Sequence, residues 1–116
     1  ISFCHPGSTA TLPLMRGSQA NNLLLVHRAG QGSIRNLPEI ALPPLPELIA
    51  VVEGLARLAR PQGQAPAQVK AIALNTALLD EREAAAAIEQ TAAETGRCCA
   101  DPVRGGADRL LEALLS

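Results

Sequence analysis

The sequence predicts an α/β domain built on a parallel sheet, and three observations support this fold class. Short apolar runs alternate along the chain with longer amphipathic segments, in the order strand, helix, strand, helix, strand, helix. The apolar runs are continuous rather than alternating, which is typical of strands buried on both faces. Helix-length connections between consecutive strands form right-handed βαβ units, and these give parallel pairing.

The first half of the chain contains one predicted strand and one long predicted helix. Residues 1–21 are rich in turn-forming residues, with a short helix possible around residues 12–15. The apolar run 22–27 is the first strand. Residues 28–45 contain two glycines and three prolines, and they are predicted as a long loop at the carboxyl end of that strand. Pro46 begins a helix whose apolar stripe would face the sheet, and Pro61 ends it.

The second half repeats the strand–helix pattern twice. Residues 69–74 form the second predicted strand, and Asp80 with Glu83 has the spacing of a capping box. The helix that follows ends at Gly96, and residues 98–100 form a short third strand. Residues 101–106 are predicted as a loop, and residues 107–115 as a final amphipathic helix.

Composition excludes several classes of protein. The chain has 116 residues and a formal charge of −1, so it lacks the basic surface that a nucleic-acid-binding protein needs. No apolar run reaches the roughly 20 residues that cross a bilayer, which argues against an integral membrane protein. The chain begins with Ile1 and offers few strands for a sheet covered on both faces, so we expect a piece of a longer polypeptide.

The cysteines indicate a reducing compartment rather than a disulfide framework. The chain has an odd number of cysteines, and two of them, Cys98 and Cys99, are adjacent. We therefore expect cytoplasmic localisation and inert, buried thiols. The spacing of the cysteines and of His5 and His27 matches no zinc motif, so no metal site is expected.

Three polar clusters follow the predicted strands and would meet at one edge of a parallel sheet. The first, residues 27–35, contains His27, Arg28, Ser33 and Arg35. Guanidinium groups bind carboxylates and phosphates in a bidentate manner, so this loop is a candidate anion site. The other interpretation is a solvated loop in which the glycines serve only the turns.

The other two clusters follow the second and third strands. Asn75-Thr76 could recognise an adenine edge or could simply form an Asx turn. In Asp101-Pro102-Val103-Arg104, Arg104 could bind an anion, or Asp101 could hold Arg104 and the turn. His5, in a separate amino-terminal loop, is a candidate acid–base group or a structural residue.

Several motifs, taken in order, resemble one family. They are His5-Pro6-Gly7, the segment 14–19, the loop 27–35 leading into 42–49, the segment 71–76, and residues 101–104 followed by Gly106-Ala107. Together they resemble the two-domain bacterial family, long catalogued as of unknown function, that is associated with D-glutamate N-acetyltransferases of the DgcN type. The resemblance covers nearly the whole chain.

This resemblance implies a fold and an activity. Residues 1–116 would be the carboxy-terminal portion of a three-layer, P-loop NTPase-like α/β domain, with the phosphate-binding loop and a Rossmann-like domain upstream. The enzyme would transfer an acetyl group from acetyl-CoA to the amino group of D-glutamate, and we expect it to be a homo-oligomer. By analogy with dethiobiotin-synthetase-like P-loop proteins, Asn75, Thr76 and Pro102 would line a pocket for the CoA adenosine.

The remaining roles follow from this assignment. His27 or His5 would be the base that deprotonates the D-glutamate ammonium group. Arg28, Ser33 and Arg35 would hold the substrate carboxylates, and Arg104 would bind a CoA phosphate.

Two other functions are open at this point. One is an ATP-dependent ligase or kinase-like enzyme that uses ATP with Mg²⁺ on a small carboxylate, and that hydrolyses nucleotide as product forms. The other is a non-catalytic nucleotide-binding module, which the loss of the P-loop from the natural chain would indicate.

Overall fold

The computed structural model describes residues 3–116, so the expectation drawn from Ile1 lies outside the described residues. The chain divides into two compact units, which are described separately. One unit comprises the described residues up to 21 together with Gln31–Ala67, and the other comprises Asn22–Gly30 and Gln68–Ser116.

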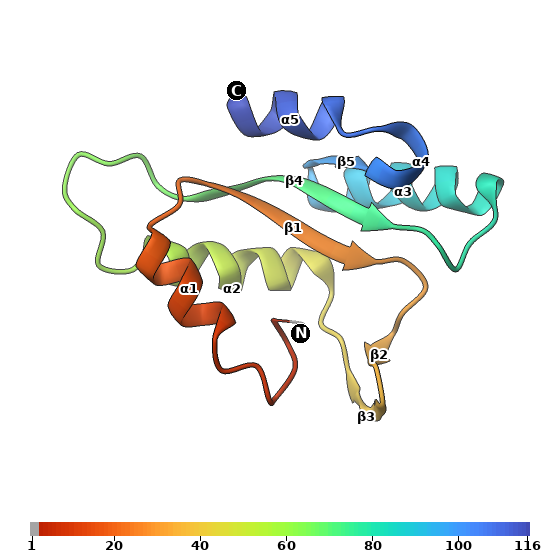
Figure 1. The fold of residues 1–116 in the computed structure, drawn as a ribbon, viewed down its shortest axis with the longest axis horizontal. Coiled ribbons are helices and arrows are strands. Elements are labelled where there is room, and N and C mark those ends of the chain that lie inside the picture. The colour runs from red at the N-terminus through yellow and green to blue at the C-terminus, as the bar shows by residue number, and fades with distance from the viewer. Residues whose placement is uncertain (1–2) are drawn as a thin grey trace. The chain divides into compact units, whose positions relative to one another are not determined.

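The second unit contains the predicted parallel sheet. Its strands are β1 (Asn22–Arg28), β4 (Gln68–Asn75) and β5 (Cys98–Ala100), arranged in the order β1-β4-β5 (Figure 1). Both pairings are parallel, with Leu25 opposite Ile72 and Ile72 opposite Cys99. Ile72 and Leu74 of the central strand are almost completely buried, as the continuous apolar run predicts.

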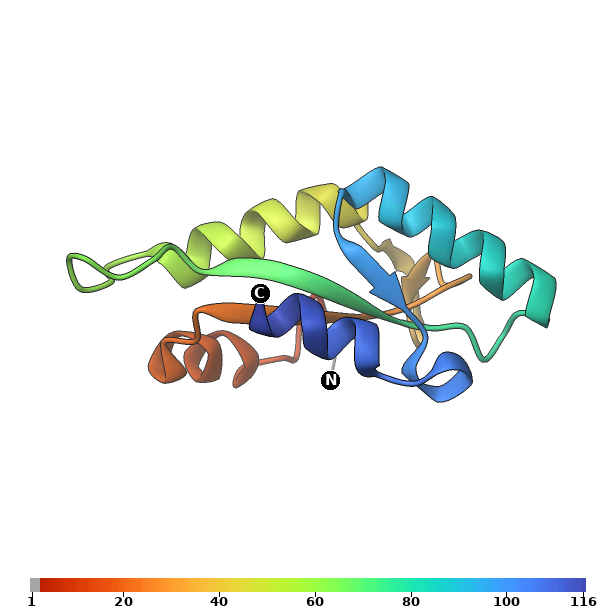
Figure 2. The ribbon, with the colours of Figure 1, turned by 90° about the horizontal axis from the view of Figure 1, so that it is seen from above.

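Helices cover both faces of this sheet. Helix α3 (Glu81–Thr95) and helix α5 (Asp108–Leu115) lie on opposite sides of it (Figure 2). Leu110 of α5 packs on Ala71 and Ala73, whose side chains share one face of β4. The alternate residues, which include Ile72, Leu74 and Cys99, face the other side. This layered arrangement confirms the predicted fold class.

Helix α3 begins and ends where the sequence predicts. The Asp80 side chain accepts a hydrogen bond from the Glu83 N–H at 2.8 Å, and the Glu83 carboxylate accepts from the Asp80 N–H at 3.2 Å. This capping box satisfies N–H groups that the first turn leaves without helical partners. At the other end, Gly96 adopts a left-handed conformation with φ 66°.

One short helix corrects the prediction for residues 101–106. Pro102–Gly105 form helix α4 rather than a loop. Asp101 caps this helix, because its carboxylate accepts hydrogen bonds from the N–H groups of Val103 and Arg104. Proline is well suited to the first helical position, where its missing N–H has no helical partner to lose.

The first unit contains helix α1 (Thr11–Ser18), strands β2 (Ser33–Ile34) and β3 (Leu37–Ala41), and helix α2 (Leu45–Arg57). The α1 guanidinium of Arg16 donates hydrogen bonds to the carbonyls of Leu55 and Leu58, at 3.2 and 2.9 Å. These bonds tie α1 to the end of α2. The apolar stripe of α2 is buried at Ile49, Val52 and Ala56.

The prediction that residues 28–45 form an unstructured loop is wrong. Its middle part forms the antiparallel β2-β3 hairpin, with Asn36 in the left-handed conformation at the turn (φ 66°). Asparagine tolerates this conformation better than most residues.

None of the described helices is long and apolar enough to cross a membrane. Within residues 3–116, no group of histidine, cysteine and acidic side chains is placed to hold a metal ion.

Candidate functional site at the carboxyl edge of the sheet

The carboxyl ends of β1, β4 and β5 meet at one edge of the second unit. Arg28 and Asn75 are register partners at the ends of β1 and β4, and the Ala29 N–H donates to the Asn75 carbonyl at 2.9 Å. Asp101 follows β5 directly. The parallel sheet therefore brings together Arg28, Asn75, Thr76, Pro102 and Arg104, as the sequence predicts for parallel strands.

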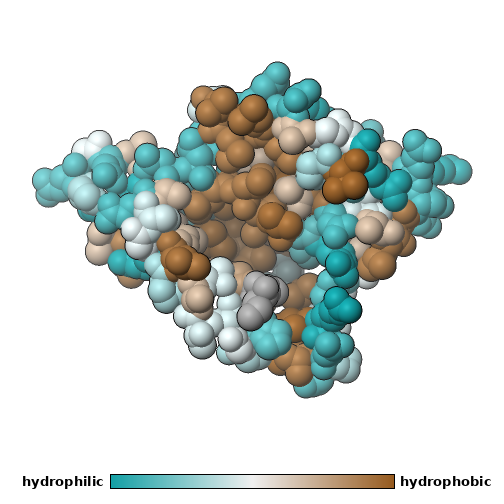
Figure 3. All heavy atoms as spheres, viewed as in Figure 1, coloured by the Kyte–Doolittle hydropathy of each residue, from teal (hydrophilic) through white to brown (hydrophobic). Residues whose placement is uncertain are grey.

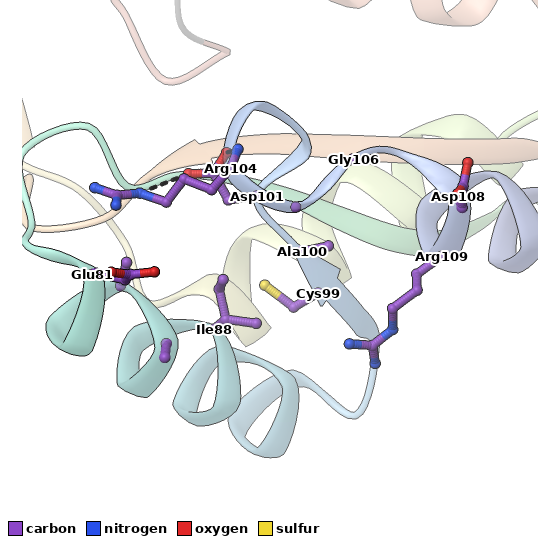
Figure 4. A pocket seen from close by; sticks show the side chains of 12 residues that line it. Glu81, Ile88, Cys99, Ala100, Asp101, Arg104, Gly106, Asp108 and Arg109 are labelled. Carbon is purple, nitrogen blue, oxygen red and sulfur yellow. Dashed lines mark hydrogen bonds and ion pairs between the residues drawn. The ribbon is translucent and has the colours of Figure 1, made fainter.

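A buried hydrogen-bond network joins the ends of β4 and β5. Thr76 is fully buried, and both its N–H (3.0 Å) and its hydroxyl donate to the Asp101 carboxylate. Arg104 extends across this network, and its Nε donates to the Thr76 hydroxyl at 2.8 Å. The same Nε lies 3.8 Å from the Asp101 carboxylate (Figure 4). Its Nη2 donates to the carbonyls of Thr76 and Leu79, at 3.2 and 2.6 Å.

Asp101 is ionised within this network. Burial raises the pKa of a carboxyl group, but hydrogen bonds from the Thr76 hydroxyl, the Thr76 N–H and the N–H groups of Val103 and Arg104 outweigh it. The pKa of Asp101 is therefore lower than its ordinary value. Asp101 holds both Arg104 and the turn, which is the structural interpretation that the sequence left open.

In the side-chain amide of Asn75, the oxygen is hydrogen-bonded and the nitrogen, in the part of the chain that the structure describes, is not. Its Oδ1 accepts a hydrogen bond from the Ala77 N–H at 3.0 Å, which is the predicted Asx turn. Asn75 is half-buried, and within residues 3–116 its Nδ2 has no hydrogen-bond partner and can donate to a ligand. Pro102 is half-buried at the start of α4.

His27 lies one residue before the end of β1. It is paired with Leu74, so its ring is on the face of the sheet opposite Ala71 and Ala73. Burial lowers the pKa of His27 below 6.5, and the Glu94 carboxylate opposes this effect. The imidazole is therefore largely neutral at pH 7 and can accept a proton.

The other predicted site residues belong to the first unit. The Nδ1 of His5 accepts a hydrogen bond from the Gly7 N–H at 2.9 Å. Ser33 lies in β2, where its carbonyl accepts from the Gln31 side chain at 2.8 Å, and Arg35 is exposed at the hairpin turn. His5, Ser33 and Arg35 therefore all lie outside the unit that contains Asn75 and Arg104.

Two features of the edge were missed by the sequence analysis. Thr76 serves as an anchor for Arg104, and the Leu79 carbonyl completes the Arg104 contacts. No local pattern marks a main-chain carbonyl as an acceptor. The sequence named Thr76 as a nucleotide contact, but nothing in it shows that Thr76 is bonded to a residue 25 positions later.

One family model matches nearly the whole of this chain. The family model described as "Domain of unknown function (DUF1611_C) P-loop domain" matches residues 1–111. The crystal structure of a DUF1611 family protein from Anabaena variabilis has a TM-score of 0.88 and 55% identity, over 98% of this chain and 33% of that chain.

Two curated relatives carry a functional name. A D-glutamate N-acetyltransferase of Tritonibacter scottomollicae is 35% identical over 107 residues, which cover 92% of this chain and 31% of that protein. A D-glutamate N-acetyltransferase of a Pseudoalteromonas species is 27% identical over 114 residues, covering 97% and 33%. The chain thus spans about a third of the length of these relatives.

Proposed function

The chain belongs to the DUF1611 family of P-loop domains, and from this premise we propose that it is part of an N-acetyltransferase acting on D-glutamate with acetyl-CoA. The observation that carries the proposal is the shared name of two relatives whose matches cover 92% and 97% of this chain. The polar edge of the second unit supplies groups suited to the nucleotide portion of CoA.

The nucleotide would be held by the ends of β4 and β5. The free Nδ2 of Asn75 can donate to a ring nitrogen of adenine, with Thr76 fixing the strand end and Pro102 as an apolar neighbour. The Nη1 of Arg104 takes no part in the bonds to Thr76 and Leu79, so it remains for a phosphate oxygen.

The chemistry requires an amine nucleophile. A base removes one proton from the D-glutamate ammonium group, and the nitrogen then attacks the thioester carbonyl carbon. A C–N bond forms, the C–S bond breaks, and the CoA thiolate accepts the second proton that the nitrogen loses as the amide forms. His27 is suited to the role of base because its lowered pKa keeps it neutral. His5 is the second candidate. Because its Nδ1 accepts a hydrogen bond from the Gly7 N–H, Nε2 carries the hydrogen of the neutral ring, and Nδ1 would take the proton once that bond opens.

In the second unit, Arg28 would hold a substrate carboxylate, and the same role for Ser33 and Arg35 of the first unit stays a prediction from the sequence. Arginine pairs with carboxylates in a bidentate geometry, and serine adds a hydroxyl donor. Arg28 lies at the end of β1 in register with Asn75, which would bring one substrate carboxylate to the same edge as the CoA adenosine.

The test is a CoA-release assay on the natural polypeptide that carries this chain. We expect release of free CoA from acetyl-CoA that depends on D-glutamate, exceeds that with L-glutamate and needs no ATP. Asn75→Leu should raise the KM for acetyl-CoA, whereas Gln90→Leu on the exposed surface of α3 should not. Unchanged turnover in a His27→Ala, His5→Ala double variant would exclude both bases.

The P-loop family favours one alternative, an ATP-dependent enzyme acting on a small carboxylate. The same assay separates the two. Formation of ADP with D-glutamate or another carboxylate, without release of CoA from acetyl-CoA, would replace the acetyltransferase by a ligase or kinase-like reaction.

A further inference from the structure

A pocket lies beside β5, at the end of the sheet in the second unit. It has a volume of about 700 Å³ and lies between α3 and the segment that connects α4 to α5 (Figure 4). This volume is within the range of small-molecule sites in proteins. Of the residues given roles above, Arg104 also lines this pocket, whereas Asn75, His27 and the residues of the first unit do not.

The floor of the pocket is apolar and uncharged. It consists of Ala84, Ala85 and Ile88 on α3, together with the side chain of Cys99 on β5. Burial and the neighbouring Cys98 raise the pKa of Cys99 to about 11, although Arg109 acts in the opposite direction. The thiol is therefore neutral at pH 7, and an aliphatic chain can pack on this floor.

Arg109 is a free cation at one end of the pocket. Within residues 3–116, no ion pair or side-chain hydrogen bond engages its guanidinium. In Figure 4 it extends from α5 past β5, and both Arg109 and Cys99 line the pocket. The Nε and Nη2 of Arg104, by contrast, are already bonded to Thr76 and Leu79.

The acidic residues of the lining limit the charge of a ligand. Asp101 is buried and its oxygens accept hydrogen bonds from the protein, and Asp108 points away from the pocket in Figure 4. Glu81 lies on the α3 side of the pocket, apart from Arg109. A single negative charge at Arg109 is compatible with these residues.

We propose that this pocket binds a small monocarboxylate with a short aliphatic body, whose carboxylate pairs with Arg109 and whose chain packs on Ala84, Ala85 and Ile88. The free guanidinium supplies two parallel donors, which match the two oxygens of a carboxylate. This ligand is distinct from the D-glutamate and acetyl-CoA of the proposed reaction. Arg104 is shared between the pocket and the proposed CoA site, so hexanoate binding is measured without acetyl-CoA, and the CoA-release assay tests the reaction separately.

The experiment is methyl NMR on the polypeptide that carries this chain, titrated with hexanoate. The Ile88 methyl signals should shift in a saturable manner, and those of Ile49, which does not line the pocket, should stay in place. Hexylamine and hexanol share the chain but lack the negative charge, and both should bind at least about tenfold more weakly than hexanoate.

Two pairs of variants locate the site. Arg109→Gln should weaken hexanoate binding about tenfold or more, and Arg82→Gln, the same change on an exposed α3 residue outside the lining, should not. Ala85→Leu should fill the floor and abolish the Ile88 shift, whereas Ala86→Leu, one residue along the same helix, should preserve it.

The alternative outcomes are equally clear. Absence of a saturable shift at millimolar hexanoate would overturn the proposal, as would equal binding of hexylamine. Equal weakening by Arg82→Gln would assign the effect to net charge rather than to the pocket. If circular dichroism shows that Ala85→Leu does not fold, the comparison of Arg109→Gln with Arg82→Gln tests the proposal by itself.

Discussion

Asp101 organises the candidate site at the scale of single residues. It is 5% exposed, and its carboxylate accepts hydrogen bonds from Thr76, Val103 and Arg104, so one side chain fixes the end of β4 and the start of α4. Asn75 and Arg104 owe their positions to these bonds. The sequence indicated that Asp101 and Arg104 belong together, but it could not show that Thr76, 25 residues earlier, is their common partner.

We predict that Asp101→Asn destabilises the protein by about 1–3 kcal/mol at pH 7, because an amide nitrogen would then face a Thr76 donor. Since the pKa of Asp101 is lowered in the folded state, its stabilisation is present above the unfolded value of about 3.9 and is lost as the pH falls through the folded value. Urea unfolding from pH 7 to pH 3 measures this. The difference from wild type should shrink toward acidic pH, and a difference independent of pH would contradict the assignment.

Local signals predicted the elements of the second unit well. A few adjacent residues are enough to predict the strand at 69–74, the helix start at Asp80 and Glu83, and the helix end at Gly96. The observed bounds of β4 and α3 agree with these predictions within a residue or two. The α4 helix was missed although Asp-Pro is a good helix start, because the glycines at 105 and 106 favour a loop.

The β2-β3 hairpin could not be predicted from such signals. Both strands are short, and β3 contains Pro38, so the sequence shows neither alternation nor a continuous apolar run. For the same reason, the sequence placed Ser33 and Arg35 with Arg28 in one loop. In the structure these residues belong to a separate unit from Arg28.

At the scale of an element, the capping box should contribute measurably to α3. Asp80→Ala removes the acceptor of the Glu83 N–H and should cost about 1 kcal/mol in the free energy of unfolding. Glu89→Ala removes an acidic side chain from the exposed middle of the same helix and provides the control. Urea unfolding compares the two, and equal losses would mean that helix charge, not capping, is responsible.

At the scale of the whole molecule, the sheet of the second unit is covered unevenly. Helix α5 packs on β4 and β5, whereas Leu24 and Val26, on the same side of β1, are 41% and 72% exposed. Apolar side chains gather over β1 and the end of α5 on the face drawn in Figure 3. Within the described residues β1 pairs only with β4, so its outer edge has free N–H and C=O groups. An apolar strand with a free edge favours pairing with another chain.

The 116-residue chain should therefore self-associate through β1. Val26→Lys places a charge on the exposed apolar strand, where it opposes edge-to-edge pairing, and light scattering across a concentration series should show less association than in wild type. Val103→Lys is the matched control, because Val103 is 93% exposed on α4, away from that strand. A general gain in solubility from added charge would affect both variants equally. A decrease specific to Val26→Lys would identify β1 as the associating surface, and an equal decrease in both would refute it.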